Sequence, residues 1–278
     1  PLSISLVSDF DQRRERWIEK PARYLERADL SADGRHAALT ARGRVTLAGV
    51  GPQRRVDIGA PLTTRLASAV VGRDGKFVYA ISDASGEEEI WQFSSDGAPG
   101  GTQLTDDGGT QRWNLYLSPD GKTIAHDDKR GRLWLLDIAS KRNRLLDDGG
   151  KDGNEGYSDI AWSPDSRHLA FVRATKAGGR ERIALAARDG SHMEWLTSEK
   201  YESVSPVFSR DGRWLWFLSE RQFDLVNRAP WGDRNTGAFF DKRSKIYAIA
   251  LQADSRFPFL PQDELAPDED DDKDAEKD

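Results

Sequence analysis

The chain of 278 residues contains no cysteine, one methionine and four histidines. Without cysteine it can form neither disulfides nor thiolate metal sites. It has no stretch of about 18 apolar residues, so we predict no transmembrane helix, and no signal-peptide pattern opens the sequence. These absences exclude disulfide scaffolds and integral membrane proteins built from helices, but they do not choose a compartment.

Motifs that carry chemistry are also missing. The sequence has no GxSxG elbow, no HExxH pair and no glycine-rich phosphate loop before a helix. Its histidines have structural roles as their simplest account: His36 and His168 follow turns, His126 lies inside a strand, and His192 lies in a hairpin loop. We interpret residues 126–129 as a polar hairpin tip. We therefore predict no catalytic residue, no metal site and no cofactor.

Charge is concentrated at one end of the chain. Of the net charge of −6, residues 263–278 contribute −8 through ten acidic residues and two lysines, so the remainder carries +2. A nearly neutral body gives no reason to expect a nucleic-acid partner, because nucleic-acid-binding domains are usually basic. The acidic segment has the composition of a solvated linker, although a partner that recognises acidic residues is the alternative.

A turn motif recurs along the whole sequence. In Ser118-Pro119-Asp120-Gly121, proline presets φ at the second corner and glycine follows the aspartate, which suits a type I turn. Copies stand at residues 31–34, 72–75, 163–166 and 209–212, and their aspartates are separated by 41, 46, 45 and 46 residues. A repeat of this length with strand-like units is typical of propeller blades rather than of helical solenoids.

Each repeat has the pattern of four strands. An alternating strand precedes the turn, and a continuous apolar strand, which we expect to be buried on both faces, follows it. A third strand occurs in all five units and a weaker fourth in four of them. We predict an all-β fold, a β-propeller of four-stranded antiparallel blades. The five blades occupy about residues 22–64, 65–110, 111–156, 157–200 and 201–251.

The segments outside these blades have other roles. Residues 1–21 read as a strand and link from a preceding blade, and residues 252–278 as a proline-containing exit segment followed by the acidic linker. The fifth blade carries a long insertion between Gln222 and Lys245. Its aromatic residues should pack on the propeller itself or contact a neighbouring domain or ligand. These interdomain contact candidates are Trp231, Phe239 and Phe240.

The start of each innermost strand should border the central channel of a propeller. Eight to ten residues before the turn aspartates, the sequence places aromatic or basic side chains. These substrate-channel candidates are Tyr24, Arg65, Arg112, Tyr157 and Tyr201. Such a ring could hold an extended peptide by stacking and by charge. The alternative is that they are ordinary residues at strand ends.

Several stretches resemble the tricorn protease family, and in particular its second, seven-bladed propeller. They are the run from Leu6 to Trp17, the repeated turns, Ala229-Pro230-Trp231-Gly232, and the strand from Tyr247 to Leu251 ahead of the acidic linker. The resemblance covers essentially the whole chain. The repeated turn alone is less specific, since the Tol-system periplasmic propeller and the prolyl-oligopeptidase group share it.

The resemblance implies a module of a large cytoplasmic serine protease that trims peptides. The implied partners are peptides, the catalytic and PDZ-like domains of the same polypeptide, and further copies of the chain. The family's catalytic residues lie outside the propellers, so none maps here, and the propeller admits and filters substrate. Since seven blades are expected, two should precede Pro1, and an open arc of five should close into a tighter ring or self-associate. The alternatives are a periplasmic binding scaffold like the Tol-system propeller and the gating propeller of a prolyl-oligopeptidase-type hydrolase.

Overall fold

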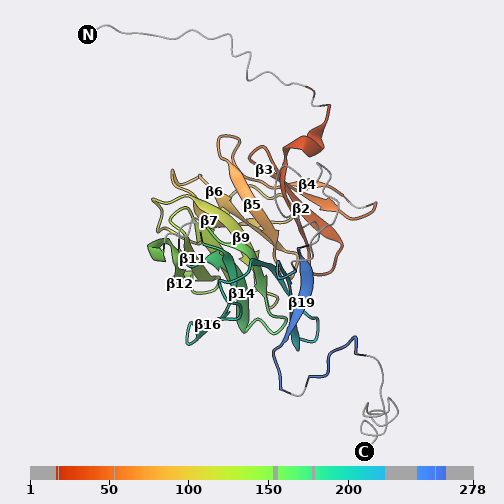
Figure 1. The fold of residues 1–278 in the computed structure, drawn as a ribbon. Helices are drawn as coiled ribbons and strands as arrows, with labels where there is room; N and C mark the ends of the chain where they lie inside the picture. The colour runs from red at the N-terminus through yellow and green to blue at the C-terminus, as the bar shows by residue number, and fades with distance from the viewer. Residues whose placement is uncertain are drawn as a thin grey trace, which may run out of the picture.

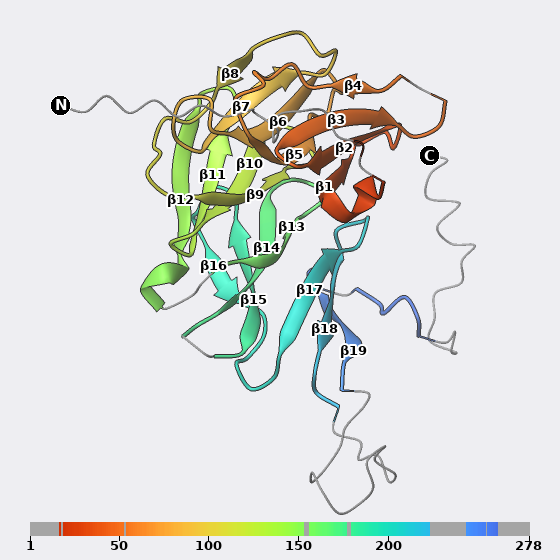
Figure 2. The same ribbon diagram turned by 90° about the horizontal axis from the view of Figure 1, so that it is seen from above.

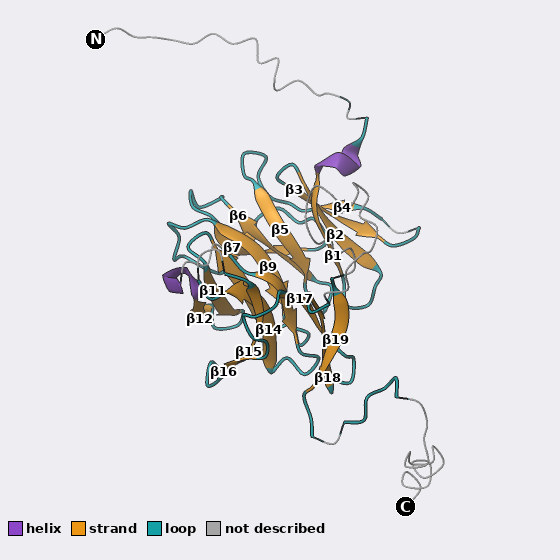
Figure 3. Ribbon diagram, viewed as in Figure 1, coloured by secondary structure: helices purple, strands orange, loops and turns teal. Residues whose placement is uncertain are grey.

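The structure is a computed structural model that describes residues 17, 19–52, 54–152, 156–176, 179–222, 243–253 and 255–260. Within these residues the chain is built almost wholly from strands and the loops that join them (Figure 3). Five antiparallel sheets follow one another along the sequence, and each is a simple meander in chain order (Figure 1). The prediction of an all-β array of propeller blades is confirmed.

The strands are best described by their place in each sheet. The first strands are β1 (Leu25–Leu30), β5 (Leu66–Val71), β9 (Arg112–Leu117), β13 (Ser158–Trp162) and β17 (Ser203–Phe208). The second strands are β2 (His36–Ala41), β6 (Phe77–Ser82), β10 (Thr123–Asp128), β14 (His168–Ala174) and β18 (Trp214–Ser219). The third strands are β3 (Arg44–Gly49), β7 (Glu89–Ser94), β11 (Arg132–Asp137), β15 (Glu181–Ala187) and β19 (Lys245–Ala250). The fourth strands are β4 (Val56–Asp57), β8 (Gly101–Gln103), β12 (Arg142–Asp148) and β16 (Met193–Trp195).

The first strands lie on the inner side of the array. They contact one another from sheet to sheet, β1 with β5, β5 with β9 and β13 with β17, and they gather toward the middle of the molecule in Figure 2. Among the described residues, the short 3₁₀ helices η2 (Pro21–Tyr24) and η3 (Gly149–Asp152) precede the first and fourth sheets. Among the described residues the fifth sheet has three strands.

The repeated turn joins the first strand to the second in every sheet. In the third sheet the Gly121 amide donates to the Ser118 carbonyl oxygen at 2.8 Å, which closes the turn. Asp120 Oδ1 accepts from Ser118 Oγ at 2.6 Å and from the Lys122 amide at 3.0 Å. The same Ser–Asp bonds recur in the turns that begin at Ser31, Ser163 and Ser209. The recurring aspartates are therefore turn-forming residues, as the sequence predicts.

The hydrophobic core is divided into four clusters, and each fills the space between two neighbouring sheets. The second strands of the second, third and fourth sheets each contribute to two clusters. On β14, Leu169 and Phe171 face the third sheet, whereas Ala170 and Val172 face the fifth. Alternating side chains of one strand thus enter different clusters, which is why these strands read as continuous apolar runs.

Candidate functional site at the inner strands

Each first strand contains a β-bulge. In the second, fourth and fifth sheets the pairing register shifts between Ala67 and Val70, between Ser158 and Ala161, and between Val204 and Val207. The bulges hold a non-glycine residue at positive φ, which L-residues rarely adopt. These residues are Ser68, Asp159 and Ser205, with φ of 48°, 51° and 54°. The strained backbone recurs at the same position of three repeats, so we infer that this position has a specific role in the fold or in function.

The position six residues before the turn aspartate carries a polar side chain in every sheet. It lies in the bulge of the second to fifth sheets and directly after the bulge of the first. Its occupants are Arg27, Ser68, Asn114, Asp159 and Ser205. We call these five residues the inner polar ring. From the sequence we predicted the alternation of this strand and the aromatic or basic residues at its start, but not the polar position between them. An alignment of the five repeats on their turn aspartates shows that position.

Members of the inner polar ring bind the backbone of a neighbouring sheet. Ser68 Oγ accepts from the Leu115 amide at 3.0 Å. Asp159 Oδ2 accepts from the Ser205 amide at 3.0 Å and from Ser205 Oγ at 3.2 Å. These bonds satisfy backbone amide groups on the inner edges of the first strands. They also fix the offset between consecutive first strands.

Among these contacts, those of Arg27 join residues that are farthest apart in the sequence. Arg27 starts on β1, and its guanidinium donates to the Leu115 carbonyl oxygen at 2.8 Å and to Asn114 Oδ1 at 3.3 Å, both on β9. It also lies 5.2 Å from the centroid of the Tyr116 ring, within the range of a cation–π contact. The side chain therefore passes β5 and joins the first sheet to the third along the inner side of the array.

Behind the ring lies a buried polar network between the second and third sheets. Arg112 Nη2 contacts Glu89 Oε2 at 2.8 Å and Asp107 Oδ1 at 2.5 Å. Asp107 Oδ2 accepts from Asn143 Nδ2 at 2.9 Å, and Asn143 Oδ1 lies 2.9 Å from His126 Nε2. The network thus connects a glutamate of one sheet to a histidine inside the next.

The interpretation of residues 126–129 as a polar hairpin tip was wrong. His126, Asp127 and Asp128 lie on β10 and are fully or almost fully buried, and the turn begins only at Lys129. Their partners come from elsewhere in the sheet: Asp128 Oδ2 accepts from Trp134 Nε1 at 3.0 Å and pairs with Arg132 at 2.6 Å. Polar side chains occupy this strand because neighbouring strands supply donors for them.

Burial shifts two adjacent pKa values in opposite directions. It raises the pKa of the Asp127 carboxyl to about 6, although that group accepts a hydrogen bond from the Asn114 amide at 3.1 Å. Burial, together with the Arg112 guanidinium, lowers the pKa of His126 to about 4. His126 Nδ1 and Asp127 Oδ2 find no hydrogen-bond partner among the described residues. At neutral pH this strand therefore holds a neutral imidazole beside a carboxylate that is easily protonated.

The five channel candidates from the sequence fall into two groups. Tyr24, on η2, and Arg65, before β5, are exposed, and Tyr201, before β17, is half-buried. Arg112 and Tyr157 are buried, each with 6% of its surface exposed. Tyr157 Oη bonds Asp147 Oδ2 at 2.6 Å, and burial raises the pKa of this hydroxyl.

The candidates are thus held in separate local contacts, with Arg42, for example, 4.9 Å from the Tyr24 ring centroid. Their role in binding peptide stays a prediction. Trp231, Phe239 and Phe240, as well as residues 1–16 and 261–278, lie outside the described residues. Within the part of the chain that the structure describes, no cluster of three His, Asp or Glu side chains could hold a metal ion, and no helix is long and apolar enough to span a bilayer.

Comparison with known proteins places these observations in a family. A family model described as "Tricorn protease second beta propeller domain" matches residues 25–278. Tricorn protease homolog 1 of Streptomyces coelicolor is 28% identical over 246 residues, which are 87% of this chain and 22% of that protein. The chain spans about a quarter or less of the length of the tricorn relatives that it matches first.

Solved structures share the fold. The crystal structure of the tricorn protease superposes with a TM-score of 0.70 at 19% identity, over 86% of this chain and 22% of that one. A TolB from Agrobacterium tumefaciens superposes with a TM-score of 0.56 at 20% identity, over 82% of this chain and 77% of that one. At such identities the likeness concerns the fold alone.

Proposed function

Because the chain belongs to the tricorn protease family, as its second β-propeller domain, we propose that it is a non-catalytic module that admits and filters peptides. On this proposal the peptides travel to an active site in other domains of the same polypeptide. The module's own contribution is a polar inner surface on a rigid frame of sheets.

The observation that carries the proposal is the inner polar ring. An extended peptide presents amide donors and carbonyl acceptors along its length, whatever its sequence. Arg27 has guanidinium N–H groups beyond the two that bind β9, and Asp159 and Ser205 offer acceptors, along the side where the first strands meet. Asp159 is exposed and Ser205 half-buried, so the fourth and fifth sheets present this polar surface most openly. Such a surface favours weak contacts with many sequences over tight binding of one.

The recurring serines and aspartates have another task. Ser118 Oγ donates to Asp120 and accepts from the Thr123 amide at 3.0 Å, and the equivalent serines do the same in their own turns. A hydroxyl that is held in this way joins the two ends of its turn through one donated and one accepted hydrogen bond. These contacts support a structural role for the repeat.

A binding measurement tests the proposal. We expect a fluorescein-labelled, unstructured peptide to bind the 278-residue chain by anisotropy, and Asp159→Asn to weaken that binding about tenfold, as loss of one charged hydrogen bond would. Glu87→Gln, which removes the same charge from an exposed loop, is the matched control and should leave binding unchanged. Equal binding by both variants, or no binding at all, would contradict peptide admission and leave the scaffold alternative.

A second assay tests the absence of catalysis. The chain should not cleave a fluorogenic peptide. Turnover that a serine-directed inhibitor abolishes would contradict the assignment of catalysis to other domains.

We also propose that the module works next to other domains or copies. The two outermost sheets of the array expose apolar side chains, with Leu30 61% and Ile246 71% exposed. Exposed apolar residues at a sheet face favour association. Light scattering should therefore show concentration-dependent self-association, and a strict monomer at all concentrations would speak against it.

A further inference from the structure

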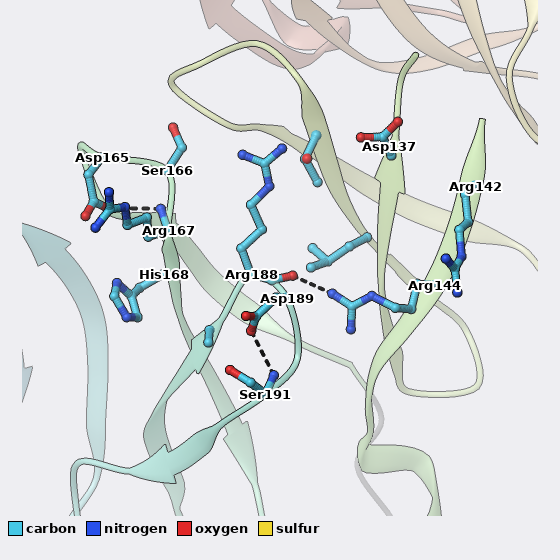
Figure 4. Close-up of a pocket in the computed structure, with 13 residues that line it drawn as sticks. Asp137, Arg142, Arg144, Asp165, Ser166, Arg167, His168, Arg188, Asp189 and Ser191 are labelled. Atoms are coloured by element: carbon cyan, nitrogen blue, oxygen red, sulfur yellow. Dashed lines mark hydrogen bonds between the residues drawn. The ribbon is translucent and has the colours of Figure 1, made fainter. Parts of the chain in front are cut away.

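A cleft of about 760 Å³ lies between the third and fourth sheets, on the side of the repeated turns, and arginine side chains line it. Figure 4 shows Arg142 and Arg144 on β12 at one side of the cleft, and Arg167 and Arg188 beside β14 and β15 at the other. His168 also lines the cleft. The peptide-admission proposal makes no use of these residues.

The carboxylates in the cleft are occupied by their own turns. Asp137 Oδ1 accepts from the Ser140 amide at 2.9 Å, and Asp189 Oδ1 accepts from the Ser191 amide at 2.9 Å. Asp165 Oδ1 accepts from Ser163 Oγ at 2.6 Å and from the Arg167 amide at 3.0 Å. These bonds fix the carboxylates at the rim, where they form no ion pair with the arginines of the cleft among the described residues.

The four guanidinium groups are not equally engaged. Arg188 Nη1 pairs with Asp120 Oδ2 at 2.6 Å, and Arg144 donates to the Arg188 carbonyl oxygen. Arg142 and Arg167, both exposed, make no hydrogen bond or ion pair through their guanidinium groups to any described residue. Each offers a planar fork of donors that matches a carboxylate. The cleft therefore has two guanidinium groups that are free to bind carboxylates.

The chain itself carries acidic residues that can reach this cleft. Two neighbouring hollows lead to it from the exit segment. Ser255, Arg256 and Pro258 line one hollow together with Asp211. The next hollow shares Asp211 with the first and shares Asp165 and His168 with the arginine cleft. A continuous path thus runs over the turn side of the fifth and fourth sheets.

Length and charge agree with this path. The residues after Leu260 number 18, which in extended form reach at most about 60 Å. Ten of the residues from 263 to 278 are acidic and two are lysines, whereas the rest of the chain carries a net charge of +2. The segment is therefore long enough, and of the right sign, to supply the missing carboxylates.

We propose that the acidic segment, residues 263–278, docks intramolecularly in the arginine cleft between the third and fourth sheets, with carboxylates on Arg142 and Arg167. Docking holds residues 263–278 on the turn side of the array. The cleft is thereby closed to acidic segments of other proteins. The contact is electrostatic and partly exposed, so salt weakens it.

Competition measures this docking directly. In the test protein, the ten acidic residues of 263–278 are replaced by Asn or Gln in the otherwise unchanged chain of 278 residues. A fluorescein-labelled synthetic peptide of residues 263–278 is then titrated against this protein and against the natural chain. We expect the neutralised chain to bind the peptide at least about tenfold more tightly, because in the natural chain the tethered segment holds the cleft. Equal affinity for both proteins, or no binding to the neutralised chain, overturns the proposal.

Cleft variants locate the contact. In the neutralised chain, the double change Arg142→Ala and Arg167→Ala should weaken peptide binding about tenfold, as expected for the loss of two exposed ion pairs. The matched control, Arg23→Ala with Arg35→Ala, removes the same charge from exposed sites on η2 and in the turn between β1 and β2, and it should change the affinity less than about twofold. Equal losses in the two double variants would mean attraction to the whole surface and would overturn the assignment to the cleft. All four arginines are exposed, so the variants should keep the melting temperature of their parent, which circular dichroism checks.

Discussion

Arg27 and Leu115 are 88 residues apart in sequence, yet the guanidinium of the first donates to the carbonyl oxygen of the second at 2.8 Å. Because this bond joins the first sheet to the third, it bypasses the sheet between them. It limits how far the inner strands can separate.

Arg27→Ala should therefore destabilise the array. The change leaves the Leu115 carbonyl oxygen without this donor and removes the bond to Asn114, and we expect a loss of about 1–2 kcal/mol in the free energy of unfolding, measured by urea titration. Arg35→Ala, an exposed change on the same sheet, should cost less than about 0.5 kcal/mol. Equal losses would mean that the Arg27 bond adds nothing to stability.

Arg112 should be needed as a charge partner. It is 4% exposed and pairs with Glu89, whose side chain is 2% exposed, so Arg112→Ala leaves a buried carboxylate unpaired. We expect a loss of about 3–5 kcal/mol. The double change Arg112→Leu and Glu89→Leu should recover part of that loss, because it leaves no unpaired charge in the Arg112–Glu89 pair. If the double variant loses as much free energy of unfolding as the two single variants together, the two side chains are not coupled.

His126 and Asp127 should oppose each other in acid. The pKa of His126 is about 4 in the folded chain and 6.5 in a free side chain, so between those values the unfolded chain binds a proton that the folded chain does not. Stability from His126 is therefore lost as pH falls through this window. The pKa of Asp127 is about 6 when folded and 3.8 when free, so the folded chain binds the extra proton and gains stability as pH falls.

Single substitutions separate these two effects. Asp127→Asn should make the protein lose stability more steeply than the natural chain between pH 6.5 and 4.5, whereas His126→Gln should reverse that trend. Each effect amounts to roughly 3 kcal/mol across its window. Urea titrations at pH 7, 6 and 5 measure the difference, and stability curves that run parallel for all three proteins would contradict it.

Ser166 should tolerate glycine better than alanine. It holds the last turn position at φ of 60°, where the other turns have glycine, and its Oγ accepts from the Asp120 amide at 2.9 Å. Both substitutions lose that bond, but only alanine retains the strain of positive φ. The free energy of unfolding, measured by thermal melts, should be about 1 kcal/mol lower for Ser166→Ala than for Ser166→Gly. If Ser166→Ala is the more stable variant, the positive φ at this position does not determine their relative stability.

Local sequence predicts the frame of this molecule well. The turn at Ser118–Gly121 depends on residues that adjoin one another, and the run from Leu169 to Val172 reports burial on both faces through composition alone. Both features could therefore be predicted from a single sequence. The number of sheets and the order of their strands followed from the repeat.

The polar interior could not be predicted in the same way. His126 is buried because Asn143 and Trp134, on other strands, contact it, and nothing near it in sequence signals those contacts. The inner polar ring depends on bulges, which shift the register by one residue and so turn Ser68 and Asp159 out of simple alternation. The periodicity of a sequence does not predict the burial of side chains whose partners lie far away in the sequence.

The four core clusters are bounded by neighbouring sheets only, with none common to the whole array. Duplication or deletion of one complete sheet therefore creates or removes a single boundary and leaves the others intact. Evolution can widen or narrow such an array in steps of one repeat. The hydrogen bonds of the inner polar ring, by contrast, join the first strands of different sheets, and the bond from Arg27 to Leu115 passes a whole sheet. Insertion or deletion of a sheet would therefore break these bonds.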